Sequence, residues 1–183
     1  MIWQVSIYYL SLPISKMVKK IILLLLFPFF SVLQNTFFGH FGKTAGILNF
    51  VLVFFVVILF FDKRIAKSYF LYPVAFFAGL SLDLFSPFFF GVYILLFFVL
   101  AEVLKRISFL VVKKNFITFI FSLVVSILLF ELAESFIFSM SAKQYIPVQF
   151  SRVIYNCLLG SLLYLGYVCI KKVTSSKKKK RRN

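Results

Sequence analysis

Long apolar runs alternate with short basic segments along nearly the whole chain. The runs are continuous stretches of Leu, Phe, Val and Ile rather than ten-residue alternations, so we expect helices and not barrel strands. Runs long enough to cross about 30 Å of hydrocarbon recur along the whole chain, and no stretch is left over for a soluble domain of useful size. The pattern predicts one embedded all-α domain of six transmembrane helices, at about residues 21–38, 45–61, 69–84, 87–104, 115–138 and 148–170.

The junction between the third and fourth runs carries the dipeptide Ser86-Pro87. Serine is a good helix N-cap and proline suits the first helical position, whereas an interior proline would remove a backbone hydrogen bond. We therefore expect two helices here, the fourth beginning at this dipeptide.

Composition and charge agree with a membrane protein and give its orientation. Hydrophobic residues make up 62% of the chain, charged residues 14%, and the mean hydropathy is +1.02. Of the 21 basic residues, 18 fall in the termini and in every second connection, which by the positive-inside rule predicts a multi-pass protein with both termini in the cytoplasm.

The net charge of +16 is spread over all the predicted cytoplasmic segments, so topology explains it better than a nucleic-acid partner. The tail at residues 171–183 is dense enough in lysine and arginine to hold anionic lipid headgroups.

The first sixteen residues are too short to span a membrane and contain Pro13, so we expect the domain to cover residues 17–170. Met17 followed by two lysines and an apolar helix reads as a normal start, which makes residues 1–16 a non-native extension from a misassigned start codon. An interfacial amphipathic segment is the alternative. The first run lacks a small-residue cleavage site, so we expect it to be a retained span and not a signal peptide.

The sequence contains few residues or motifs that could support catalysis or bind a cofactor. The chain has one histidine, two cysteines without metal-ligand spacing, and no nucleophile-elbow, phosphate-loop or dinucleotide motif. We therefore expect no cofactor, no metal and no enzymatic activity.

Polar side chains at membrane depth are costly, so each requires an explanation. Glu102 lies near the cytoplasmic end of its run, where Lys105 and Arg106 are in helical reach. Most of the others fall at one common outer depth, which predicts a polar cluster or an outward-opening pocket between helices. The alternative is a set of unrelated interfacial residues. The residues concerned are Gln34, Asn35, Thr36, Asp83, Glu131, Glu134, Arg152 and Asn156.

Asp83 allows two compatible interpretations. It can cap the turn and the N-terminus of the fourth helix, where the helix dipole favours a negative group. It can also face a cavity between helices. Ala75 and Gly79 lie on its helical face and form a small-residue seam that lets another helix approach closely.

Three short motifs give the chain a resemblance to MreD-type rod-shape-determining proteins over about residues 17–170. The first apolar helix ends in Leu33-Gln34-Asn35-Thr36, the third run ends in Gly79-Leu80-Ser81-Leu82-Asp83, and Gly91 leads into the next helix. The resemblance implies a non-enzymatic scaffold of the bacterial cell-elongation complex in the cytoplasmic membrane. It would bind the bitopic protein MreC and, indirectly, actin-like MreB, a RodA-type glycosyltransferase and a class B penicillin-binding transpeptidase. It would thereby support cell shape and lateral peptidoglycan synthesis.

Two other functions remain open from the sequence. The family's six-helix arrangement resembles the substrate-binding subunits of energy-coupling-factor transporters, so the outer polar cluster could bind a vitamin-like ligand. An intramembrane enzyme could pair Asp83 with Glu131 or Glu134 as acid and base, although the sequence offers no evident nucleophile. For the scaffold, a partner helix is expected to pack on the Gly79 seam.

Overall fold

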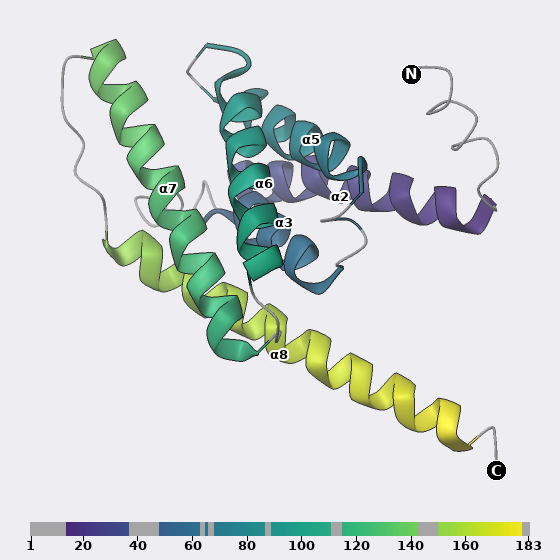
Figure 1. Ribbon diagram of the computed structural model, residues 1–183. Helices are drawn as coiled ribbons and strands as arrows, with labels where there is room; N and C mark the ends of the chain where they lie inside the picture. Colours follow the sequence, from purple (N-terminus) through teal and green to yellow (C-terminus); the bar gives the residue numbers. More distant parts are fainter. Residues whose placement is uncertain are drawn as a thin grey trace.

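The computed structural model describes residues 14–36, 48–62, 65, 68–86, 89–110, 115–142 and 150–180. Within these residues the chain is all-α, as predicted, and contains no strand (Figure 1). The six helices are α2 (Ile14–Thr36), α3 (Phe50–Phe61), α5 (Leu71–Asp83), α6 (Val92–Leu110), α7 (Phe116–Ala142) and α8 (Phe150–Lys180). Most of residues 1–16 and the connections at 37–47 and 143–149 lie outside the described part, so the predictions made for them are not addressed.

Two of the described helices contain a segment long and apolar enough to cross a membrane, Phe116–Ile137 in α7 and Phe150–Cys169 in α8. A core helix of a soluble protein can satisfy the same criteria, but it would be mostly buried. Only 39% of the α7 segment and 11% of the α8 segment are buried. Apolar helices of shorter length occupy Lys20–Thr36, Phe50–Phe61 and Leu71–Asp83.

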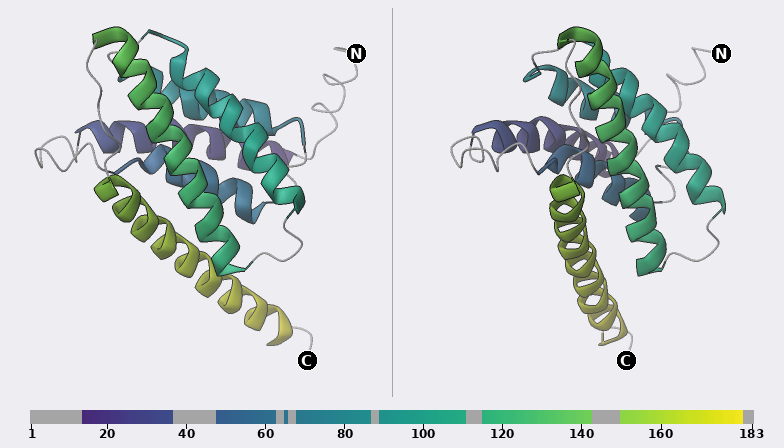
Figure 2. Two further views of the ribbon diagram at one scale, coloured as in Figure 1. Left: turned by 60° about the vertical axis from the view of Figure 1, so that its left-hand side comes forward. Right: turned by 90° about the vertical axis from the view of Figure 1, so that its left-hand side faces the viewer.

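The short helix α3 is the centre of the structure. It packs against α2, α5, α6, α7 and α8, and Figures 1 and 2 show it enclosed by them. Its sequence is apolar on every side, which is the pattern of a helix buried all round. Phe55 of α3 contacts Phe97 of α6, with ring centroids 5.0 Å apart, and Phe97 contacts Phe130 of α7 at 6.0 Å. Edge-to-face aromatic pairs of this kind join the central helix to its neighbours.

Several helix boundaries differ from the prediction for identifiable reasons. Helix α6 begins at Val92 and not at Ser86-Pro87, after Gly91 adopts a positive φ of 100° that suits glycine. Helix α3 begins at Phe50 and not near residue 45, because the Asn49 side chain caps it by accepting from the Leu52 amide at 3.0 Å.

Helix α8 continues ten residues beyond the predicted end of the last span, through the basic segment to Lys180. No glycine or proline occurs between residues 167 and 180 to stop it. Figures 1 and 2 show the C-terminal half of α8 extending away from the other helices.

Candidate functional site

Two ion pairs join α7 and α8. Arg152, in the first turn of α8, directs Nη1 at Glu131 Oε1 (3.3 Å) and at Glu134 Oε2 (3.2 Å) of α7. The two glutamates reach one guanidinium because residues three apart share a helix face. Glu131 is buried and the other two side chains are half-buried, so each carboxylate depends on this cation for compensation.

Tyr93 connects this ion cluster to α6. Its hydroxyl donates to Glu134 Oε1 at 2.7 Å, while its ring stacks on Phe130 with centroids 5.7 Å apart. The sequence analysis did not anticipate this contact. The pairing of this tyrosine with Glu134, 41 residues away, can be recognised only when α6 and α7 are known to be neighbours.

Asp83 caps the N-terminus of α6. Its Oδ1 accepts from the Tyr93 amide at 3.1 Å, and its Oδ2 accepts from the Ile94 amide at 3.2 Å. The side chain is buried at 5% exposure and satisfies two of the free N–H groups at this helix start. The capping interpretation is therefore confirmed, although the helix that it caps starts six residues later than Ser86.

The small-residue seam on α5 is occupied by the chain itself. Gly79 is buried, and a Cβ on it would lie within 3.0 Å of the Ile94 backbone on α6. Ala75 is also fully buried. The prediction of a close helix approach is confirmed, but the expectation that a partner helix packs on the Gly79 seam is wrong, because α6 fills it.

Asn156 and Gln34 extend the polar contacts to α3 and α2. The Asn156 side-chain oxygen accepts from the Asn49 amide at 2.8 Å, and its Nδ2 donates to the Arg152 carbonyl at 2.8 Å. Gln34 Oε1 accepts from the Phe50 amide at 3.0 Å. Two orphan N–H groups at the start of α3 thus receive partners from other helices.

One further contact closes the series. The Ser31 hydroxyl of α2 donates to the Ser81 carbonyl of α5 at 2.6 Å, and both residues are buried. Polar contacts therefore connect the helices in a closed cycle, from α2 to α3, α8, α7, α6, α5 and back to α2. We call this set the polar ring; it consists of Ser31, Gln34, Asn49, Ser81, Asp83, Tyr93, Glu131, Glu134, Arg152 and Asn156.

The structure thus joins most of the residues that the sequence placed at one depth. Asn35 and Thr36 differ, because both are exposed and their side chains donate to carbonyls of their own helix, at Ser31 and Val32. Gly91 contributes its backbone conformation and no side chain. For the ring members, the alternative of unrelated interfacial residues is wrong. Sequence reasoning missed Ser31, Asn49, Ser81 and Tyr93; of these only Asn49, directly before an apolar helix, carried a local signal as an N-cap.

A smaller polar cluster joins α5 and α6 at a different level. Tyr72 donates its hydroxyl to Glu102 Oε1 at 2.7 Å, and Lys105 Nζ lies 3.4 Å from the same oxygen. The predicted pairing of Glu102 with Lys105 is confirmed. The carboxylate remains accessible, since 44% of its side chain is exposed.

Comparisons with protein-family models, with curated proteins and with solved structures found no match.

Proposed function

We propose that this chain is a non-enzymatic, multi-pass scaffold of the bacterial cytoplasmic membrane, of the MreD type, which binds an MreC-like bitopic protein in the cell-elongation complex. Through that protein it would act with MreB, a RodA-type glycosyltransferase and a class B penicillin-binding transpeptidase. The basic segment after residue 170 would hold anionic lipid headgroups.

The observation that carries the proposal is that the side chains of the polar ring bind groups on neighbouring helices. Arg152 pairs with two carboxylates, Asp83 engages two backbone amides, and Asn156 bridges α8 to α3. These interactions hold helices together, which is what a scaffold requires. A substrate site would instead direct convergent polar groups at a ligand.

The membrane arrangement in the proposal has six crossings and both termini in the cytoplasm, as in the substrate-binding subunits of energy-coupling-factor transporters. Helices α3 and α5, of 12 and 13 residues, are only about 18 and 20 Å long at 1.5 Å per residue. They would cross together with their non-helical flanking residues. Irregular backbone is tolerated at membrane depth where protein encloses it, and α3 has five helical neighbours.

The test is reciprocal affinity purification after co-expression with the MreC-like bitopic protein of the same organism, at matched membrane levels. The scaffold predicts stable recovery of both proteins and retention of rod shape only while the chain is present. Failure to recover the bitopic protein, together with vitamin uptake that depends on this chain, would support the transporter function instead.

A further inference from the structure

The junction between α7 and α8 holds two carboxylates and one cation. Glu131 and Glu134 both contact the same nitrogen of Arg152, Nη1, at 3.3 Å and 3.2 Å. Among the described residues, one of the two negative charges is therefore left without a cation of its own. Carboxylates that share a site in this way repel each other when both are ionised.

The helices packed on α7 do not offset this repulsion within the described part of the chain. Helix α3 is apolar throughout, and α6 contributes the uncharged hydroxyl of Tyr93. Asp83, bonded to the Tyr93 amide, adds a further carboxylate. Tyr155 of α8 is 49% exposed and carries no charge at neutral pH. Lys105 of α6 follows Tyr93 by twelve residues, which places it about 18 Å further along the helix axis.

The two glutamates are not equivalent. Glu134 accepts from the Tyr93 hydroxyl at 2.7 Å on one oxygen and from Arg152 at 3.2 Å on the other. Among the described residues, Glu131 accepts only from Arg152, at 3.3 Å. Its side chain is 10% exposed, against 24% for Glu134. The more buried carboxylate with fewer donors is the one that gains more from binding a proton.

Arg152 has an unused donor beside these carboxylates. Its Nε is buried without a hydrogen-bond partner among the described residues, while Nη1 serves both glutamates. A guanidinium holds a single carboxylate most firmly with two parallel N–H donors. The unused Nε therefore suits a second arrangement, in which Arg152 pairs with one glutamate alone.

We propose that the α7–α8 junction is a proton-binding site, in which Glu131 takes up one proton from an acidified medium and Arg152 turns to hold Glu134 with two donors. The proton adds to a carboxylate oxygen of Glu131 and leaves one cation facing one anion. The medium reaches the junction, since the side chains of Arg152 and Glu134 are 27% and 24% exposed. This site goes beyond the proposed function and needs no partner; under the proposed topology it would respond to the extracytoplasmic medium.

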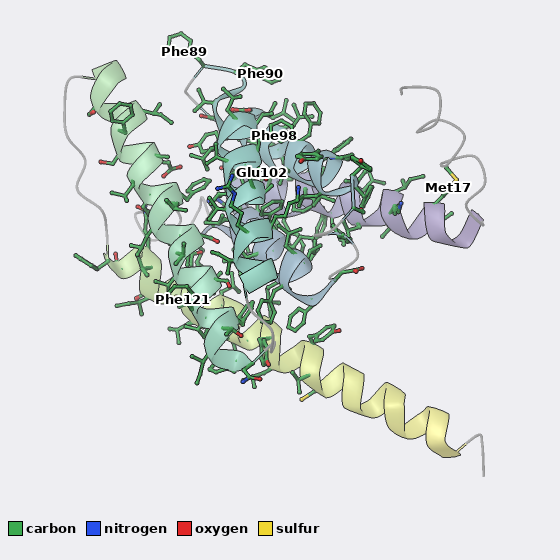
Figure 3. The ribbon with its side chains drawn as sticks, in the orientation of Figure 1. Met17, Phe89, Phe90, Phe98, Glu102 and Phe121 are labelled. Carbon is green, nitrogen blue, oxygen red and sulfur yellow. The ribbon has the colours of Figure 1, made fainter. Side chains whose placement is uncertain are left out.

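The proton is tested by infrared difference spectroscopy on the purified full chain in nanodiscs, between about pH 8 and about pH 5. We expect wild type to gain a carboxylic-acid C=O band in acid, and Glu131→Gln to lack it. Glu134→Gln should also lack the band, because Glu131 then has Arg152 to itself. Glu102→Gln is the matched control and should keep the band, because Glu102 lies on α6 and pairs with Lys105 (Figure 3).

Thermal unfolding of the same proteins tests the coupling to stability. Protonation removes a repulsion that exists in the folded junction and not in the unfolded chain, so its benefit is present in acid and is lost as the pH rises. Over the same acidification, the Tm of wild type should rise by about 2 to 4 °C relative to that of Glu131→Gln. Arg152→Lys keeps the charge but cannot form the two-donor contact, so it should show a smaller rise.

Each outcome decides a separate part of the proposal. A band that is absent from wild type, or that persists in Glu131→Gln, would overturn the site. A band that persists in Glu134→Gln would show that burial of Glu131 alone binds the proton, and would overturn the role of the shared cation. An equal rise in Arg152→Lys would overturn the turn of the guanidinium. Failure of Glu131→Gln to fold would also overturn the site, because glutamine has the shape of the neutral acid.

Discussion

Arg152→Met is the substitution that most directly perturbs the polar ring. Methionine keeps much of the length and apolar volume of the arginine stem but removes the cation between α7 and α8. Glu131 and Glu134, with side chains 10% and 24% exposed, then lose their compensating charge. The cost comes mainly from leaving these carboxylates in a poorly solvated place.

The expected magnitude follows from burial. Breaking a fully buried ion pair by removing one partner costs about 3 to 5 kcal/mol. Arg152 is 27% exposed, and its Nε is buried without a partner among the described residues, so its pairing is incomplete. We therefore expect a loss of about 2 to 3 kcal/mol, which for a chain of this length lowers the Tm by about 5 to 10 °C.

The assay is thermal unfolding of purified protein in detergent or nanodiscs, with intact folding monitored by size-exclusion chromatography. Adding Glu131→Gln and Glu134→Gln to Arg152→Met removes the uncompensated charges, so the triple variant should recover most of the lost Tm. Lys105→Met, at the exposed contact with Glu102, is the matched control and should leave the Tm unchanged. The electrostatic role of the polar ring would be refuted if Arg152→Met were as stable as wild type, or if the triple variant were no more stable than Arg152→Met.

Three further predictions address the cap, the close helix approach and the topology. Asp83→Asn should lower the free energy of unfolding by about 1 kcal/mol, because asparagine keeps one of the two side-chain acceptors. Asp83→Leu should lower it by about 2 to 3 kcal/mol, because the two amides at the start of α6 then have no acceptor. Equal losses for the two variants in thermal unfolding would contradict the capping role. Gly79→Ala should lower the free energy of unfolding by about 1 to 3 kcal/mol, because the added Cβ meets the α6 backbone. Gly166→Ala is the control and should be neutral or stabilising, because no atom lies within 4 Å of the added Cβ. Equal effects of the two substitutions would show that α5 and α6 are not in contact. A reporter fused after Asn183 should report cytoplasm and one inserted after residue 143 the outside; the reverse would exclude the proposed topology.

The sequence predicted that the described part of the chain is helical, because continuous apolar runs separated by basic residues leave few alternatives. It also predicted that Asp83 caps a helix and that Glu131 and Glu134 act from one face, since both follow from local geometry. Helix ends were less predictable. Ser86-Pro87 is a strong local start signal, but α6 begins only after the positive φ of Gly91 and on the carboxylate of Asp83, which arrives from another helix.

Contacts between helices could not be read from the sequence. Tyr93 with Glu134, Ser31 with Ser81, and Asn49 with Asn156 join positions 41, 50 and 107 residues apart, and no periodicity within a helix specifies such pairs. The Gly79 seam shows the same limit. Small residues predict a close approach, but only the fold identifies the neighbour as α6 rather than a partner.

We propose that this chain is a membrane scaffold bound to a bitopic protein of the elongation complex. The most direct test of this proposal is purification of the tagged full chain from native membranes, expressed from its own locus, followed by quantitative mass spectrometry. We expect an MreC-like bitopic protein to be recovered in near-stoichiometric amount. We expect it to be lost from the Arg152→Met variant, which breaks the polar ring, when the two forms of this chain are compared at matched membrane levels. Recovery of an ATPase module and its membrane coupling subunit, without any bitopic protein, would contradict it.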